Sequence, residues 1–215
     1  RKGLLDKYIG DAVMAVFGAP LPDPNHAEHA CYAASDILRL VQTSRQKWQE
    51  TFKFKELRIG IGINTGPMTV GNMGSVRRFD YTVIGDAVNL ASRLEGLNKF
   101  YGTSILTSEA TYRQAKGDFL FRPLDEVQVK GKKEKVRLYE LLVDPAPDQR
   151  QILPLFAEAL LRYEEGDFAR AKNLFEKCLA KYPADSPSRL FVERCGKLAS
   201  QPPEDWEGVT TFVEK

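Results

Sequence analysis

The sequence has few of the residues that would cross-link a chain or anchor it in a membrane. Its only cysteines are Cys31, Cys178 and Cys195, and no two of them have C-x-x-C spacing. Scattered cysteines indicate neither a disulfide framework nor a zinc site, and they fit a reducing compartment. No apolar run approaches the roughly 20 residues of a membrane-spanning helix, and no stretch has the pattern of a signal peptide. We therefore expect a cytoplasmic protein without membrane contact in this segment.

An excess of charge of either sign is also missing. The chain has 31 Lys and Arg against 29 Asp and Glu, a net charge of +2 over 215 residues. This balance gives no reason to expect a nucleic-acid partner. The only two histidines, His26 and His29, are three residues apart without a visible third ligand, so we interpret them as surface residues. The length allows one sizeable domain with an appendage.

The first third of the chain alternates strand and helix patterns. Residues 4–17 are two apolar runs around Gly10-Asp11, which predicts a hairpin. Asn25, with Glu28 three residues later, predicts a capping box that opens a helix ending near Glu50. Its predicted buried face is Ala27, Ala30, Cys31, Ala34, Ile37, Leu38 and Val41.

Strict alternation of isoleucine or leucine with polar residues and glycine predicts a strand over 57–63. A return strand is predicted at 68–70, followed by a flexible basic connection at 71–78. Later segments are predicted as strands at 104–106, 119–129 and 136–143, the last two forming a hairpin, and as a short helix from Ser108 to Ala115. Helices alternating with hairpins predict an α+β fold with a mixed or antiparallel sheet.

The most informative stretch runs from Arg77 to Arg93. Phe79–Ile84 is β-branched and aromatic, which predicts a strand, and Asp86 is a suitable N-cap for a helix over 87–97. Ala87, Leu90, Ala91, Leu94 and Leu97 form its apolar stripe. Asn89 and Arg93 share one face because they are four residues apart. Taken alone, Arg93 would more often be a solvated surface charge.

The C-terminal part differs in composition. Residues 144–150 contain Asp144-Pro145-Ala146-Pro147-Asp148 and are predicted as a linker, which separates a main domain over 1–143 from a tail over 151–215. Small, aromatic and terminating residues of the tail, Ala159, Gly166, Phe168, Ala171, Phe175 and Pro183, have tetratricopeptide-like spacing. A further helix is predicted near 188–200. So short a repeat segment cannot bury a core alone, so we expect it to dock on the main domain or on a protein partner.

Two segments carry a resemblance to a known family. K-Y-I-G-D-A-V-M-A-V-F-G, from Lys7 to Gly18, and Y-T-V-I-G-D-A-V-N-L-A-S-R, from Tyr81 to Arg93, resemble the class III nucleotidyl cyclases. The resemblance implies a ferredoxin-like α+β fold. It also implies conversion of ATP to 3′,5′-cyclic AMP and pyrophosphate, by attack of the ribose 3′-hydroxyl on the α-phosphate.

The same resemblance implies a role for each matching residue. Lys7 and Thr82 would read the purine, and Asn89 would orient the ribose. Arg93 would stabilise negative charge in the transition state, and Lys132, in V-K-G-K-K, would hold the terminal phosphates. Lys7 favours ATP, since guanylyl cyclases typically have Glu there. Threonine at position 82, where many adenylyl cyclases have Asp, resembles the subgroup related to bicarbonate-responsive cyclases.

Asp11 would be one of two carboxylates that hold two Mg²⁺ or Mn²⁺ ions. In the family the other carboxylate lies upstream, so we expect this chain to be an N-terminally truncated domain that is inactive alone, and its parent could be anchored upstream. The family's site lies between two domains, which implies a head-to-tail homodimer. The alternatives are a guanylyl cyclase and a catalytically silent nucleotide-binding or interaction module.

Overall fold

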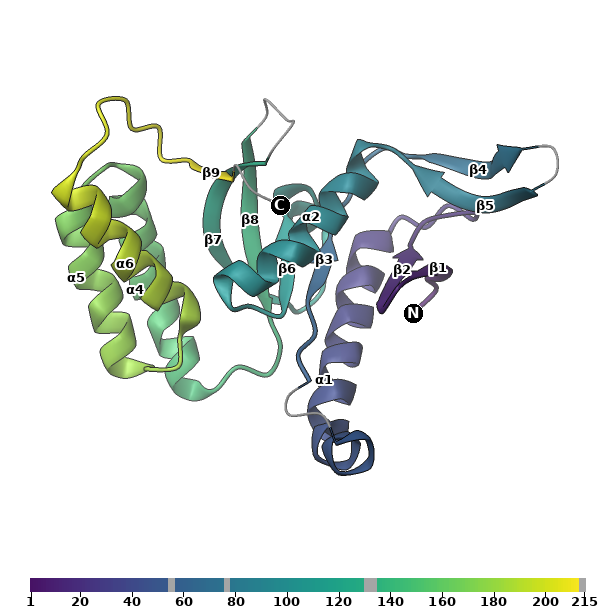
Figure 1. Cartoon of the computed structure of the whole chain (residues 1–215), viewed down its shortest axis with the longest axis horizontal. Coiled ribbons are helices and arrows are strands. Elements are labelled where there is room, and N and C mark those ends of the chain that lie inside the picture. Colours follow the sequence, from purple (N-terminus) through teal and green to yellow (C-terminus); the bar gives the residue numbers. More distant parts are fainter. Residues whose placement is uncertain (54–56, 76–77, 130–134, 213–215) are drawn as a thin grey trace.

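A computed structural model describes residues 1–53, 57–75, 78–129 and 135–212 (Figure 1). The strands are β1 Leu4–Ile9, β2 Ala12–Val16, β3 Ile61–Ile63, β4 Thr69–Ser75, β5 Arg78–Ile84, β6 Ile105–Ser108, β7 Leu120–Val129, β8 Lys135–Leu142 and β9 Thr210–Phe212. The helices are α1 His26–Phe52, α2 Asp86–Tyr101, α3 Glu109–Gln114, α4 Pro147–Glu164, α5 Phe168–Lys181 and α6 Ser186–Ser200.

The main sheet has five strands in the order β3-β6-β8-β7-β9. The pairs β3–β6 and β7–β9 are parallel, whereas β6–β8 and β7–β8 are antiparallel. The predicted α+β fold with a mixed sheet is therefore confirmed. The predicted hairpin over 119–129 and 136–143 is confirmed as well, since β7 pairs with β8 from Leu120↔Leu142 to Gln128↔Lys135.

Two antiparallel ribbons lie apart from this sheet. The β1–β2 ribbon turns at Gly10, whose positive φ of 64° suits glycine, and it confirms the hairpin predicted around Gly10-Asp11. The β4–β5 ribbon projects beyond the N-terminal end of α2 (Figure 1). Its regular pairing from Thr69↔Ile84 to Ser75↔Arg78 shows that the flexible connection predicted over 71–78 was wrong for residues 71–75 and 78; residues 76 and 77 lie outside the described residues.

Helix α2 lies directly on strand β3 at Gly62. A Cβ at this position would lie 2.2 Å from the carbonyl oxygen of Ala91 and 2.3 Å from the amide nitrogen of Glu95. Real side-chain atoms never come so close to backbone, so only glycine permits this packing distance. Gly62, one of the glycines that alternate with isoleucine in residues 57–63, thus allows the helix to contact the sheet.

The helical tail packs on the face of the sheet near β7 (Figure 1). One hydrophobic cluster joins Leu94 and Tyr101 of α2 with Ile152 and Phe156 of α4 and Phe191 of α6. Side chains of this size each contribute about 1.5–3 kcal/mol when buried. The expected docking of the tail on the main domain is confirmed, and the helix predicted near 188–200 is α6.

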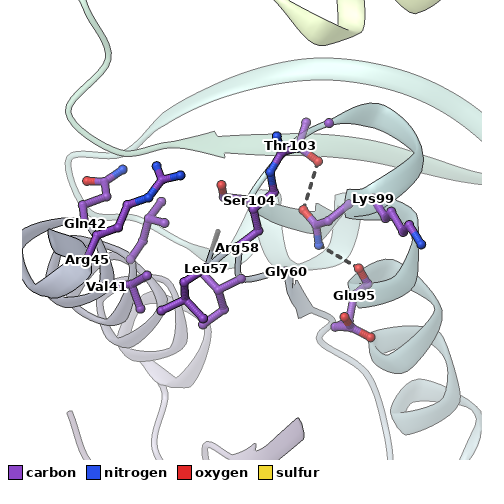
Figure 2. A pocket seen from close by; sticks show the side chains of 14 residues that line it. Val41, Gln42, Arg45, Leu57, Arg58, Gly60, Glu95, Lys99, Thr103 and Ser104 are labelled. Carbon is purple, nitrogen blue, oxygen red and sulfur yellow. Dashed lines mark hydrogen bonds between the residues drawn. The ribbon is translucent and has the colours of Figure 1, made fainter. Parts of the chain in front are cut away.

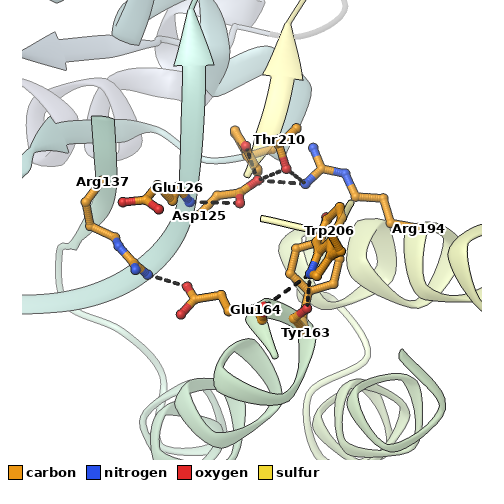
Figure 3. A network of polar contacts seen from close by, with 9 residues as sticks. Asp125, Glu126, Arg137, Tyr163, Glu164, Arg194, Trp206 and Thr210 are labelled. Carbon is orange, nitrogen blue, oxygen red and sulfur yellow. Dashed lines mark hydrogen bonds and ion pairs between the residues drawn. The ribbon is translucent and has the colours of Figure 1, made fainter. Parts of the chain in front are cut away.

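Polar contacts reinforce this docking (Figure 3). Arg194 of α6 donates to Asp125 of β7 over 2.7 Å, and Thr210 of β9 donates to the same carboxylate oxygen over 2.9 Å. The indole of Trp206 donates to the backbone oxygen of Tyr163 over 3.0 Å. After the helices of the tail, the chain therefore returns to the main sheet as β9, which pairs with β7. The same strand β7 also contacts the tail through Asp125.

A buried arginine joins the two parts at a second point. The side chain of Arg122 is 1% exposed, contacts Glu140 of β8, and donates to Asp185 over 2.8 Å. Asp185 in turn accepts from the amide of Ser188 and so caps α6. Burial alone lowers the pKa of Arg122, but the two carboxylates outweigh it and raise the pKa above its ordinary value.

Several local predictions need correction. Asn25 is at the N-cap of α1, but its side chain makes no cap hydrogen bond; its backbone N–H donates to the side chain of Asp23. Ile37, predicted as buried, is 45% exposed. The strand predicted over 57–63 is regular only at Ile61–Ile63.

Two further boundaries differ. Helix α2 begins at Asp86, so its N-cap is Gly85 and not the predicted Asp86; the φ of 148° at residue 85 is one that glycine adopts readily. Helix α4 begins at Pro147, within the segment predicted as a linker. No helix in the described part of the chain is both long and apolar enough to cross a membrane.

Replacing Arg122 by methionine should destabilise the protein by about 3–5 kcal/mol, because Glu140 and Asp185 would be left buried without their cation. Urea unfolding measures the change. The exposed Arg170→Met is the matched control and should change stability by about 0.5 kcal/mol or less. Equal effects of the two substitutions would contradict a structural role for Arg122.

The three cysteines should resist thiol reagents while the protein is folded. Burial raises the pKa of Cys31 to about 12, of Cys178 to about 11 and of Cys195 to about 12, so little thiolate exists at pH 8. A colorimetric thiol assay should detect no rapid reaction in buffer and three reactive thiols in denaturant. A rapidly reacting thiol in the native protein would show that its site opens.

Candidate functional site

The structure brings Lys7 and Thr82 together although 75 positions separate them in the sequence. Lys7 is on β1 and Thr82 is on β5, and both approach the carboxylate of Asp6. The hydroxyl of Thr82 donates to Asp6 over 2.9 Å, and the ammonium of Lys7 lies 3.7 Å from the same oxygen. The predicted purine-reading pair therefore meets at a third residue that the sequence analysis did not select.

A bulge in β1 makes this arrangement possible. The pairing with β2 shifts between Leu5 and Lys7, so Asp6 has no partner in the register. In a regular strand neighbouring side chains point to opposite faces, whereas a bulge redirects one of them. The side chain of Asp6 is 1% exposed and that of Lys7 is 38% exposed. The carboxylate is therefore covered while the ammonium remains accessible.

Asn89 and Arg93 lie one helical turn apart near the start of α2, as predicted. Asn89 is exposed, and Arg93 is half-buried. The Nη1 atom of Arg93 is buried and has no hydrogen-bond partner within the described parts of the chain. An unpaired buried guanidinium nitrogen costs free energy, and an anionic ligand would supply the missing acceptor.

The rest of α2 fixes the position of these two side chains. Ala87 and Leu94 are buried beneath the helix, and the amide of Asn64 donates to the Ala87 carbonyl over 2.9 Å. At the other end the hydroxyl of Tyr101 donates to Asp125 over 2.6 Å. Burial and the Asp125 charge raise the pKa of Tyr101, so this hydroxyl stays protonated and keeps donating.

Asp11 is exposed at the turn between β1 and β2. A carboxylate is a suitable ligand for Mg²⁺ or Mn²⁺. However, no group of three or more His, Cys, Asp or Glu side chains within the described ranges could hold a metal ion. Asp11 alone therefore fits one ligand position of such a site and does not complete it.

Lys132, predicted to hold the terminal phosphates, lies outside the described residues. The nearest described lysine on this hairpin is Lys135, at the start of β8, which forms an ion pair with Glu207 over 2.8 Å. This ion pair joins the start of β8 to the C-terminal segment.

A cavity of about 700 Å³ lies elsewhere, between α1 and the C-terminal half of α2 (Figure 2). Figure 2 shows Gln42 and Arg45 of α1 on one side and Lys99 of α2 with Thr103 on the other. Lys99 is ten residues beyond Asn89, about 15 Å along the helix. None of the described predicted site residues lines this cavity, so we do not assign the nucleotide to it.

Residues 6–142 match the family described as the adenylate and guanylate cyclase catalytic domain. A similar curated protein is "Adenylate cyclase, terminal-differentiation specific" of Dictyostelium discoideum, 35% identical over 201 residues, which are 90% of this chain and 9% of that protein. Because the aligned stretch is longer than residues 6–142, it includes part of the tail. The chain spans less than a third of the length of the curated relatives it matches.

Two solved structures resemble the fold. The adenylyl cyclase CyaB from P. aeruginosa is 38% identical with a TM-score of 0.58, over 67% of this chain and 74% of that one. The guanylyl cyclase Cya2 is 31% identical with a TM-score of 0.59, over 67% of this chain and 72% of that one. The fold is thus similar to cyclases of both kinds.

The close contact between α2, the helix of Arg93, and β3 can be tested by adding a methyl group at Gly62. Gly62→Ala should destabilise the protein by about 1–3 kcal/mol, because the new methyl group would overlap the backbone of Ala91 and Glu95. Thermal unfolding measures this. Gly96→Ala, on α2 with open space around it, is the control and should be neutral or stabilising by up to about 1 kcal/mol. Equal tolerance at both glycines would contradict the close packing.

Proposed function

Because the chain belongs to the adenylate and guanylate cyclase catalytic domain family, we propose that it is the catalytic part of an adenylate cyclase. It would convert ATP to 3′,5′-cyclic AMP and pyrophosphate for cyclic-nucleotide signalling. The observation that favours ATP as the substrate is that the side chains of Lys7 and Thr82 lie together beside Asp6. An ammonium and a hydroxyl at one point can pair with the ring nitrogen and the amino group of adenine.

Arg93 is the proposed transition-state residue. Its buried, unpaired Nη1 is a fixed positive donor, and such a donor stabilises charge that develops on the α-phosphate during transfer. Asn89, one turn earlier and exposed, can hydrogen-bond the ribose. Lys132 is proposed to bind the terminal phosphates by its charge alone.

Cyclase catalytic domains generally use Mg²⁺ or Mn²⁺, which supply charge neutralisation at the phosphates when bound. We propose Asp11 as one ligand, in a site for two ions that needs additional oxygen ligands. Its place at an exposed turn leaves it accessible to a metal–nucleotide complex.

We further propose that two copies associate head to tail. The exposed faces of the two ribbons have large apolar side chains: Tyr8, Ile9 and Val13 on β1–β2, and Tyr81 and Ile84 on β5. Exposed apolar surface of this kind fits an interface. Since metal-binding and purine-reading residues occur in one chain, a symmetric pair would contain two equivalent sites. The tail is proposed as tetratricopeptide-like and as a possible contact for a further protein.

Thr82 also supports assignment to the threonine-containing subgroup of adenylate cyclases. A guanylate cyclase is the second candidate, favoured by the similarity to Cya2. Lys7 argues against it, because guanine presents a protonated ring nitrogen where adenine presents an acceptor. A silent nucleotide-binding module remains the candidate from another class, and only turnover separates it from an enzyme.

The first experiment measures cyclic-nucleotide production by the full natural gene product with Mn²⁺ and either ATP or GTP. Arg93→Ala should lower kcat by roughly 10²–10³-fold while ATP binding changes little, because its interaction is made mainly in the transition state. Arg113→Ala, an exposed arginine of α3 paired with Glu109, is the matched control and should leave both unchanged.

Equal losses of binding and turnover in Arg93→Ala would contradict the transition-state role. A folded wild-type protein that binds ATP without forming product would favour the silent module. Product from GTP in preference to ATP would favour the guanylate cyclase.

A further inference from the structure

We propose that Asp6 determines the preference for adenine by fixing the hydroxyl of Thr82 as a hydrogen-bond acceptor toward the base. This inference rests on the proposed function, in which Lys7 and Thr82 read the purine. It adds a specificity-determining residue that does not itself touch the nucleotide. The juxtaposition that carries it is one buried carboxylate oxygen shared by Thr82 and Lys7.

A threonine hydroxyl alone cannot tell adenine from guanine. It has one hydrogen to donate and two lone pairs that accept, and it rotates to suit its partner. The purine position at issue has an amino group in adenine, which donates, and a carbonyl oxygen in guanine, which accepts. An unrestrained Thr82 could satisfy either base.

Asp6 removes this ambiguity. A carboxylate accepts hydrogen bonds and has none to donate, so the 2.9 Å contact must use the hydroxyl hydrogen of Thr82. Thr82 is 7% exposed and the side chain of Asp6 is 1% exposed, so water competes little for this contact. The lone pairs of Thr82 remain for a ligand, and they match the amino group of adenine.

Lys7 completes the pattern from the other side. An ammonium can only donate, whatever its neighbours are, and its nitrogen lies 3.7 Å from the Asp6 oxygen, beyond hydrogen-bond distance, so its donor role does not depend on Asp6. The site therefore presents one donor and one acceptor next to each other. The edge of adenine presents the complementary acceptor and donor, whereas guanine would place its carbonyl oxygen against the lone pairs of Thr82.

The bulge in β1 is consistent with a role for Asp6 beyond linking two strands. Burying a carboxylate is costly unless it is well paired, and the bulge leaves Asp6 outside the pairing register of its own ribbon. A residue that served only to link β1 to β5 could be any neutral side chain that bonds Thr82. A carboxylate differs from such a side chain in the direction of the hydrogen bond, and that difference can be measured.

Asp6→Asn is the decisive substitution, because asparagine is similar in shape but its amide can donate to Thr82. The hydroxyl is then free to donate to guanine. In the full natural gene product with Mn²⁺, the ratio of kcat/KM for ATP over GTP should fall roughly tenfold. Binding of fluorescent adenine and guanine nucleotides should shift in the same direction. An unchanged ratio would overturn the proposal.

Two variants separate specificity from a structural effect. Thr82→Ser keeps the hydroxyl and should keep the wild-type ratio. Thr82→Val removes it, so adding Asp6→Asn to Thr82→Val should not change the ratio further. A further drop in the double variant would show that Asp6 acts by another route and would contradict the proposal.

The failure of the inference is distinguishable from the failure of the proposed function. If the wild-type protein neither binds nor converts any nucleotide, both fall. If it converts ATP and Asp6→Asn retains the full preference while losing stability, the adenylate cyclase assignment stands and Asp6 is only a structural link.

Discussion

The contact between α2 and β3 at Gly62 is the constraint on which the rest of the structure depends. Because Gly62 has no side chain, the backbone of α2 lies directly against β3. The distance between the helix and the sheet is therefore fixed, and so are the positions of the residues on α2. At its far end Tyr101 is bonded to Asp125. Asn89 and Arg93 are thus carried by a helix that is held at its middle, by the contact of Ala91 and Glu95 with Gly62, and at its C-terminal end, as a site of fixed geometry requires.

Much of this fold follows from sequence patterns. Period-two and period-3.6 spacing identified most strands and α1, α2, α3 and α6, because those patterns report which face is buried. The exceptions have physical causes. A flexible connection was predicted over 71–78, but residues 71–75 pair in register with β5 and belong to strand β4. The strand β9 has only three residues, too few to give a pattern.

The candidate site was predicted where its residues match the cyclase motifs or follow helix spacing, and not where it depends on a contact between distant strands. Asn89 and Arg93 share a face because of helix geometry, and Thr82 precedes them on a strand. Asp6 was missed because nothing in a single strand shows that a bulge will turn its carboxylate toward a residue 76 positions away. The one available signal was an acidic residue inside an apolar run, since a charge there needs a partner.

The pairing of β9 with β7 has a consequence for what can reach the sheet. β9 occupies the outer edge of β7 from Val127↔Thr210 to Val129↔Phe212, where an unpaired strand would otherwise recruit a foreign one. An extended peptide that added itself to this edge would have to displace β9. Displacement would also withdraw Thr210 from Asp125, the carboxylate that binds Tyr101 at the end of α2. Strand exchange at this edge is therefore mechanically linked to the helix that carries Arg93.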